Sequence, residues 1–156
     1  MPDSANNPIR VYADTSVYGG VFDDAFNHAS RMFFDQVQVG RFQLVISAVV
    51  RDELETAPAP VRELFRNVQG YAEIIEVTAA AIELRNAYLA AKIVGRRWST
   101  DALHVALATL GQCRVIVSWN FKHIVHFQKI PLYNAISAVH GYGSIAIHTP
   151  QEVTSL

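Results

Sequence analysis

Four oxygen-bearing side chains follow predicted strands or begin predicted helices, and together they could hold a metal ion. Asp14 comes directly after the segment IRVYA, and Asn120 comes two residues after RVIVS. Glu53 lies on AVVRDELETA, and Asp101 directly precedes ALHVALATL. Because oxygen ligands select hard cations over zinc, we predict Mg²⁺ (or Mn²⁺) ligands at Asp14, Glu53 and Asp101. The side-chain carbonyl of Asn120 would assist them.

A bound cation would let these carboxylates stand close together and would supply chemistry. Carboxylates crowded into one place repel and cannot all ionise unless a cation neutralises them. A bound Mg²⁺ polarises a phosphoryl oxygen and lowers the pKa of a bound water, so that hydroxide forms near neutral pH. The pattern therefore indicates hydrolysis of a phosphodiester, with the same four residues as the catalytic set.

Each of these residues also has a purely structural interpretation. An acid before a turn can form an Asx turn, and an acid in the first turn of a helix interacts favourably with the helix dipole. A histidine on a buried helix more often makes hydrogen bonds in the core than binds a ligand. The alternatives concern Asp14 (turn or cap), Glu53 (ion pair with Arg51 or Arg62), Asp101 (helix dipole), His104 (core hydrogen bonds) and Asn120 (turn).

The basic side chains gather in one segment of an almost neutral chain. The sequence has 13 Lys and Arg against 14 Asp and Glu, yet residues 85–129 carry seven basic side chains and a single acid. Such a segment indicates a phosphate or nucleic-acid partner, or else a solvated face that pairs with the acidic first half. The candidate contacts are Arg96, Arg97 and Lys122 for phosphates, and Trp98 or Trp119 for stacking on an unpaired base or for packing.

The elements that would position these residues alternate between strands and helices. Short β-branched segments predict strands, and apolar residues at i, i+3 and i+4 predict helices. Strands separated by helical segments of about a dozen residues imply an α/β fold, with a mainly parallel central sheet and helices on both faces. The predicted strands span 9–13, 42–46, 72–77, 114–118 and 145–147, and the predicted helices span 24–39, 48–57, 60–70, 79–94, 101–111, 133–140 and 149–153.

Glycines and hydroxyl side chains mark the expected ends of these elements. Gly19 and Gly20 predict a turn after the first strand. Hydroxyl side chains accept hydrogen bonds from the free N–H groups of a first helical turn, which predicts N-caps at Ser47, Thr78, and Ser99 or Thr100. Ligands in parallel sheets bind beyond the carboxyl ends of the strands, so the candidate residues are expected at that edge.

Composition limits the class of protein. A chain of 156 residues that is 51% hydrophobic and 17% charged is not disordered, and its length predicts one domain over 1–156. A lone cysteine, Cys113, excludes an internal disulfide and cysteine-based metal sites, and it fits a reducing compartment. The first ten residues are polar and no run of about 18 apolar residues occurs, so we expect a cytoplasmic protein without signal peptide or membrane span.

Four segments of the chain resemble the motifs of the PIN-domain family, within it the VapC-like ribonuclease toxins of type II toxin–antitoxin systems. YADTSVYGG resembles the first motif, with Asp14 as its acid, and SAVVRDELE the second, with Glu53. STDALHVALA resembles the third, with Asp101, and VIVSWNFKHI the fourth, with Ser118 and Asn120. The similarity runs from about residue 9 to residue 153.

This resemblance implies a Mg²⁺-dependent endoribonuclease with an RNA substrate, a parallel-sheet α/β fold, a homodimer and inhibition by a cognate antitoxin protein. The sequence departs from the commonest pattern at Asn120, where many members carry Asp. A catalytically weak or inactive PIN-like module that binds RNA or a protein partner is therefore the alternative.

In the proposed chemistry Thr15 and Ser118 orient the ligands or waters around the metal. Two other enzyme classes remain as alternatives, each with one requirement that the sequence does not clearly meet. A phosphatase that uses Asp14 as phosphoryl acceptor would need a second acid two residues later, where the chain has Ser16. A zinc hydrolase could use His123 and His126, whose spacing suits a helix, but no third ligand has a clear spacing to them.

Overall fold

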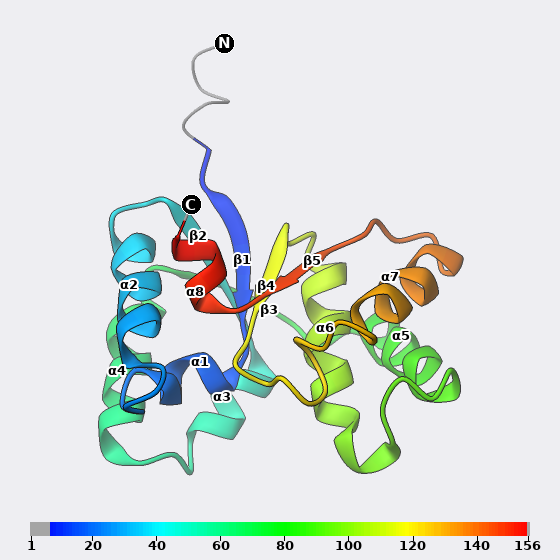
Figure 1. Cartoon of the computed structure of the whole chain (residues 1–156), viewed down its shortest axis with the longest axis horizontal. Helices are drawn as coiled ribbons and strands as arrows, with labels where there is room; N and C mark the ends of the chain where they lie inside the picture. The colour runs from blue at the N-terminus through cyan, green and yellow to red at the C-terminus, as the bar shows by residue number, and fades with distance from the viewer. Residues whose placement is uncertain (1–6, 156) are drawn as a thin grey trace.

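The computed structural model describes residues 7–155, in which five strands form one parallel sheet in the order β3-β2-β1-β4-β5 (Figure 1). The central strand β1 is buried from Val11 to Ala13, as expected for an apolar strand covered on both faces. The predicted α/β fold with a parallel sheet is confirmed. The strands are β1 (Ile9–Ala13), β2 (Phe42–Ser47), β3 (Ala72–Ile75), β4 (Val115–Val117) and β5 (Ala146–His148).

Helices cover the sheet on both faces, in three layers. Helices α1 to α4 and α8 lie on one side of the sheet in Figure 1, and α5, α6 and α7 lie on the other. Right-handed crossovers explain this division, because the chain moves outward from β1 to β3 and then returns across the sheet to β4 and β5. The helices are α1 (Thr15–Gly20), α2 (Asn27–Gln38), α3 (Ala48–Leu54), α4 (Ala59–Gln69), α5 (Ala79–Ala90), the 3₁₀ turn η2 (Arg96–Trp98), α6 (Ser99–Leu110), α7 (Ile130–Val139) and α8 (Pro150–Thr154).

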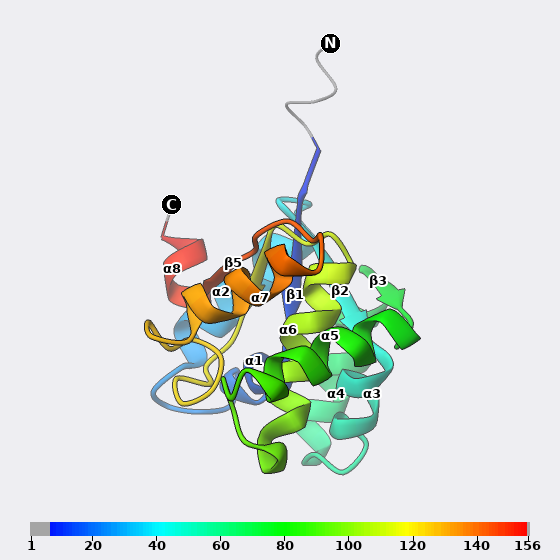
Figure 2. The same cartoon turned by 90° about the vertical axis from the view of Figure 1, so that its right-hand side faces the viewer.

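Helix α6 is the central helix of its layer. Its residues from 102 to 109 are all buried, which suits its Ala-, Val- and Leu-rich sequence. It packs along α5, and Figure 2 shows the two helices side by side on the face turned to the viewer. The burial explains why His104, on the same helix, needs partners for both ring nitrogens.

The ends of most helices differ from the sequence prediction, and α1 and α5 show two causes. Gly19 and Gly20 do not form a turn but complete α1, because Gly20 must pass close to Ser30 and Trp119: a Cβ on it would lie 2.6 Å from the Ser30 Oγ. Helix α5 stops at residue 90 rather than 94, since Lys92 adopts a left-handed backbone with φ of 60°.

Helix α6 starts two residues earlier than predicted, at Ser99. Its N-cap is Trp98, for which the described residues contain no side-chain capping bond, so the predicted cap at Ser99 or Thr100 is wrong. The two other predicted caps are confirmed. Ser47 accepts the N–H of Val50, and Thr78 accepts that of Ala81.

No helix within residues 7–155 combines the length and apolar character that a membrane crossing requires. The expectation about the first ten residues rests mainly on residues 1–6, which lie outside the described part of the chain.

Candidate functional site

The candidate site lies where the strand order reverses, between β1 and β4. The chain leaves β1 toward β2 and β3 and later returns to the other side of β1, which is the kind of position beyond the strand ends where parallel sheets bind ligands. Asp14 directly follows β1 and Ser118 directly follows β4, and the Ser118 hydroxyl donates to the Asp14 Oδ2 at 2.8 Å. The topology therefore places the first predicted acid where parallel sheets bind ligands.

Asp14 is a buried carboxylate, with only 4% of its surface exposed. Its second oxygen, Oδ1, accepts the hydroxyl of Ser16 at 2.5 Å. Burial raises the pKa of the Asp14 carboxyl, whereas the positive potential of His104 and the two hydroxyls lower it, and the nearby Asp101 carboxylate raises it again. The net pKa lies above the usual value, which is the condition that a bound cation would reverse.

Glu53 projects from α3 to the same end of the sheet, but it faces different partners. Its Oε1 accepts the hydroxyl of Thr15 at 2.7 Å and lies 2.7 Å from the Nε2 of His104. The side chain is 38% exposed. Burial opposes its ionisation, but the hydrogen bond and charge of His104, with the Thr15 hydroxyl, outweigh this effect and lower the pKa of Glu53.

A continuous chain of hydrogen bonds links Glu53 to the buried interior through His104. The Nδ1 of His104 lies 2.8 Å from the Tyr12 hydroxyl, which lies 2.8 Å from the Oγ of Ser47. An ionised carboxylate only accepts, so the His104 Nε2 must carry a proton and donate to Glu53. The hydroxyls of Tyr12 and Ser47 can each donate or accept, so every group in the chain finds a partner. His104 is thus a hydrogen-bonded core histidine that orients a candidate ligand.

Asp101 stands in the first turn of α6, partly buried, and its charge reaches several neighbours. It raises the pKa of Asp14 and opposes the burial that lowers the pKa of His123. Its charge therefore acts on groups at the end of β1 and in the loop after β4, and it also gains from the helix dipole.

Asn120 serves its own loop. Its Oδ1 accepts the backbone N–H of Lys122 at 3.2 Å and that of His123 at 2.9 Å. This is an Asx-type turn, the structural interpretation given to this residue. The amide still stands beside Ser118, whose Oγ accepts its backbone N–H.

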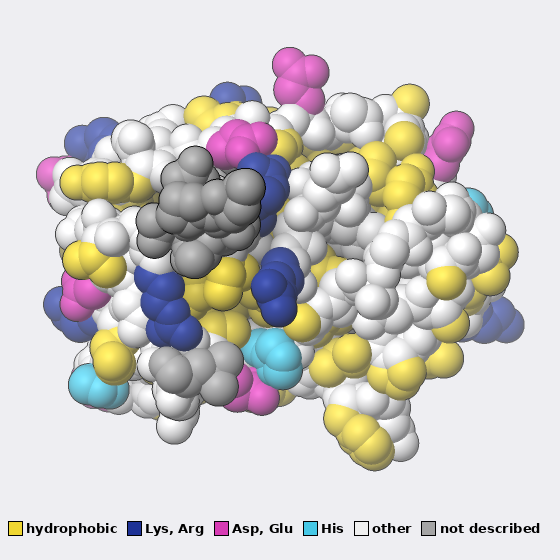
Figure 3. Space-filling view, turned by 90° about the horizontal axis from the view of Figure 1, so that it is seen from above, with side chains coloured by type: hydrophobic (Ala, Val, Ile, Leu, Met, Phe, Trp, Pro, Cys, Tyr) yellow, Lys and Arg dark blue, Asp and Glu magenta, His cyan; other side chains and the backbone are white. Residues whose placement is uncertain are grey.

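The basic candidates surround the start of α6 and the loop after β4. Arg96, Arg97 and Lys122 are exposed, and none forms an ion pair within residues 7–155. Figure 3 shows the opposite end of the molecule, where the strands begin, and there the dark-blue side chains are scattered among hydrophobic and uncharged ones.

Both tryptophans pack against the protein. The ring of Trp98 stacks on His123 at 4.6 Å between centroids, and the cations of Arg97 and Lys122 lie over it. Trp119 stacks on Phe26 at 4.2 Å. Both tryptophan rings therefore follow the packing alternative, and stacking on an RNA base stays a prediction.

The donor set fits a Mg²⁺ ion held by few carboxylates. Within the described residues no three His, Cys, Asp or Glu side chains are grouped as a metal site, and the ligand set of Asp14, Glu53 and Asp101 stays a prediction. Mg²⁺, however, is usually bound by one or two carboxylates and keeps several waters. Asp14 and Asp101 are two such carboxylates; burial is the main cause of the raised pKa of Asp14, and the charge of Asp101 adds a smaller part.

Three residues of the site were not singled out from the sequence. Ser16 bonds Asp14 and accepts the backbone N–H of Trp119 at 2.9 Å, and Tyr12 with Ser47 supports His104. Tyr12 stands two residues before Asp14. Because side chains two positions apart in a strand point to the same face, the sequence could have indicated that Tyr12 lies on the same side as Asp14. The pairing of β1 with α3 and α6 is a tertiary fact and leaves no such signal.

Neither the family models nor the curated proteins that were searched match this sequence, so the site rests on its geometry and on the four motifs.

Proposed function

We propose that this protein is a Mg²⁺-dependent endoribonuclease of the PIN-domain type, and the toxin of a toxin–antitoxin pair. The observation that carries the proposal is the buried Asp14 at the reversal of strand order, with a second carboxylate, Asp101, close enough to raise its pKa. Exposed basic side chains at the start of α6 and in the loop after β4, without ion pairs in the described part of the chain, suit a polyanion. By the same resemblance we expect a homodimer and a cognate antitoxin protein.

In this proposal each residue has a separate task. Asp14 and Asp101 would hold Mg²⁺, which when bound polarises the scissile phosphate and acidifies a water. Ser16 and Ser118 fix both oxygens of Asp14, so that its carboxylate cannot turn away. His104 and Thr15 keep Glu53 ionised at the same end of the sheet, where it can accept a hydrogen bond from water. Arg96, Arg97 and Lys122 would contact the RNA phosphates.

The test is cleavage of a single-stranded RNA by the purified protein with Mg²⁺ and with EDTA. We expect EDTA to stop cleavage and Asp14→Asn to reduce it by at least about a hundredfold, as the loss of a charged transition-state contact does. Asp35→Asn is the matched control, because Asp35 is exposed on α2. Cleavage that persists in EDTA or in Asp14→Asn would refute the proposal, provided that circular dichroism shows both variants folded.

The second candidate function is a PIN-like module that binds RNA or a protein partner without cutting. It is favoured by Asn120, whose side-chain carbonyl is occupied by two backbone N–H groups and whose amide brings no negative charge to the site. In the same assay this alternative predicts RNA binding in EDTA and no cleavage on adding Mg²⁺. Restoring the charge with Asn120→Asp would then be expected to produce metal-dependent cleavage.

A further inference from the structure

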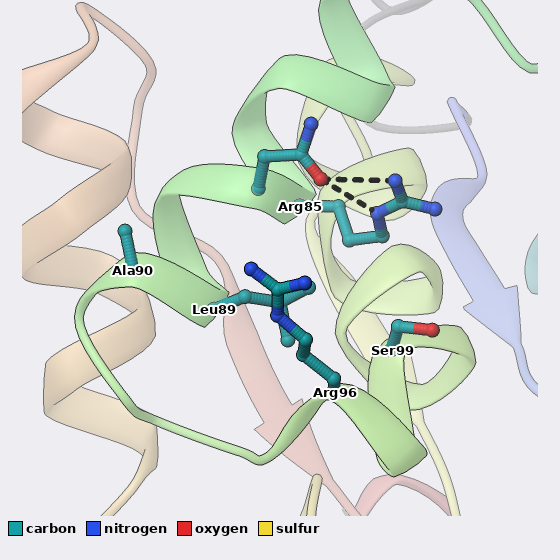
Figure 4. A pocket seen from close by; sticks show the side chains of 6 residues that line it. Arg85, Leu89, Ala90, Arg96 and Ser99 are labelled. Carbon is teal, nitrogen blue, oxygen red and sulfur yellow. Dashed lines mark hydrogen bonds between the residues drawn. The ribbon is translucent and has the colours of Figure 1, made fainter.

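A cationic hollow lies between α5 and the start of α6, outside the cluster around Asp14. Its volume is about 460 Å³, and Figure 4 shows the side chains around it: Arg85, Asn86, Leu89 and Ala90 from α5, Arg96 from η2, and Ser99 from α6. Leu89 and Ala90 supply an apolar wall, and the remaining four residues supply polar or charged groups. The elements that bear these residues come from both sides of the loop that joins α5 to η2.

The two guanidinium groups of the hollow keep their charge free. The Nε and Nη2 of Arg85 donate to the Oδ1 of Asn86 at 3.2 and 2.9 Å, as the dashed lines in Figure 4 mark. This neutral acceptor orients the guanidinium without neutralising it. Neither Arg85 nor Arg96 forms an ion pair with any carboxylate in the part of the chain that the structure describes.

The third polar contribution comes from α6. Ser99 is its first residue, and its hydroxyl makes no hydrogen bond within residues 7–155. The N-cap Trp98 makes no side-chain capping bond within the described residues, so the first N–H groups of this 12-residue helix, its positive end, have no side-chain acceptor at the edge of the hollow that Ser99 lines. Arginine forks bind phosphate through paired N–H groups, so these groups together match the chemistry of a phosphate.

We infer that this hollow binds a phosphate group of the RNA strand, one that is not cleaved. The inference rests on the proposed function for the identity of the strand. Ser99 and Asp101 share the first turn of α6 and, at 100° per residue, point to nearly opposite sides of its axis. A strand whose scissile phosphate lies by Asp101 and which crosses the start of α6 therefore brings a neighbouring phosphate to Arg85 and Arg96.

The experiment compares a double variant, Arg85→Gln with Arg96→Gln, with a control that loses the same charge, Arg31→Gln with Arg62→Gln. The control residues are exposed on α2 and α4, across the sheet. Affinity for a fluorescent single-stranded RNA is measured in EDTA at several salt concentrations, so that cleavage plays no part. We expect the pocket variant to bind RNA about tenfold more weakly than the wild type. The slope of the logarithm of its affinity against the logarithm of the salt concentration should become smaller by about 0.7 for each lost phosphate contact. The control variant should change little in both quantities.

A second arm uses inorganic phosphate on the wild-type protein, followed by the NMR signals of the arginine Nε–H groups. We expect those of Arg85 and Arg96 to shift together, and those of Arg31 and Arg62 to stay. Unchanged RNA affinity in the pocket variant overturns the inference, whether or not phosphate shifts the signals. If that variant cleaves and binds RNA like the wild type, the inference fails and the proposed function stands. If the wild type never cleaves RNA but the pocket variant loses affinity, the proposed function fails and the inference stands.

Discussion

Two carboxylates at one end of the sheet are held in opposite electrostatic states. Burial raises the pKa of Asp14 although two hydroxyls donate to it, while His104 and Thr15 overcome burial and lower the pKa of Glu53. When the surroundings shift the pKa values of two titratable groups in opposite directions, the two groups suit different chemical roles. Burial disfavours the ionised form of Asp14, which a bound cation would stabilise, whereas the hydrogen bonds of Glu53 favour its ionised form without one.

The hydroxyl of Tyr12 bonds His104, which in turn bonds Glu53, and the first prediction concerns the removal of this hydroxyl. Tyr12→Phe leaves the Nδ1 of His104 and the Oγ of Ser47 without their 2.8 Å partner in a buried place. We expect the free energy of unfolding to fall by about 1–3 kcal/mol in urea titrations. Tyr71→Phe, at a ring that is 50% exposed, should change it by less than about 0.5 kcal/mol. Equal effects of the two variants would show that the buried chain of hydrogen bonds contributes nothing.

Gly20 allows α1 to dock, and a methyl group there is the second prediction. A Cβ would lie 2.7 Å from the Nε1 of Trp119, whose ring cannot retreat because it stacks on Phe26. We expect Gly20→Ala to destabilise the protein by about 1–3 kcal/mol. Gly19→Ala is the matched control in the same helix, since its Cβ meets nothing within 4 Å, and it should stabilise by up to about 1 kcal/mol. Similar urea midpoints for the two variants would contradict this account.

The residues of the site could be predicted only as candidates. Asp14 could be singled out because it directly follows an apolar strand, although a turn or cap explained that position equally well. The partner of Glu53 could not be found in the same way: the ion pairs expected with Arg51 or Arg62 are absent from residues 7–155, and His104, 51 positions away, takes their place. Such pairings depend on how α3 and α6 meet at β1, which no local pattern records.

At the scale of elements, strand and helix types were predictable, and their ends were not. Apolar runs set β1 and β2 correctly because both strands are buried on both faces. The edge strand β3 stops at residue 75, two residues short of the prediction, because an edge has one partner to hold its end. Helix α1 was missed because two glycines normally break a helix, and here tertiary packing requires one of them.

A capping box stabilises the first turn of helix α8, and the third prediction concerns this cap. Thr149 accepts the N–H of Glu152 at 3.2 Å, and the Glu152 carboxylate accepts the N–H of Thr149 at 2.9 Å. This capping box fixes a five-residue helix that packs on α2. We expect Thr149→Ala to cost about 0.5–2 kcal/mol, measured by urea unfolding. Gln151→Ala, in the same exposed turn, should be nearly neutral, and a neutral Thr149→Ala would mean that packing alone holds α8.

At the scale of the whole molecule, the reversal of strand order links the fold to the site. Two crossovers carry the chain outward from β1 and two carry it back past β1. As a result β1 and β4 are neighbours, although the register partners Tyr12 and Ile116 lie 104 positions apart in the sequence. The alternation of elements predicted a parallel sheet, yet it did not specify which strands are adjacent. That order decides that Asp14 meets Ser118, and it had to come from the structure.

The thiol of Cys113 reports on the integrity of this central region and gives the last prediction. Cys113 lies between α6 and β4, is 6% exposed, and its pKa is raised by burial from the usual 9.0 to about 12. The folded protein at pH 8 should therefore resist iodoacetamide, because only the thiolate reacts, and labelling should follow the unfolding transition in urea. As pH rises above 9 the unfolded chain loses this proton and the folded chain keeps it, so the free energy of unfolding should fall toward pH 12.

The control is a second thiol introduced at an exposed position, Ser155→Cys, which should react at once in the folded protein. Mass spectrometry of the doubly thiol-bearing protein distinguishes the two sites within one sample. Rapid labelling of Cys113 without denaturant, at a rate near that of position 155, would show that the junction of α6 and β4 opens in the native state. Asp101 and Ser118 stand at the far ends of these two elements, so such opening would also disturb the candidate site. As temperature rises, RNA affinity should then fall in parallel with the increase in the labelling rate.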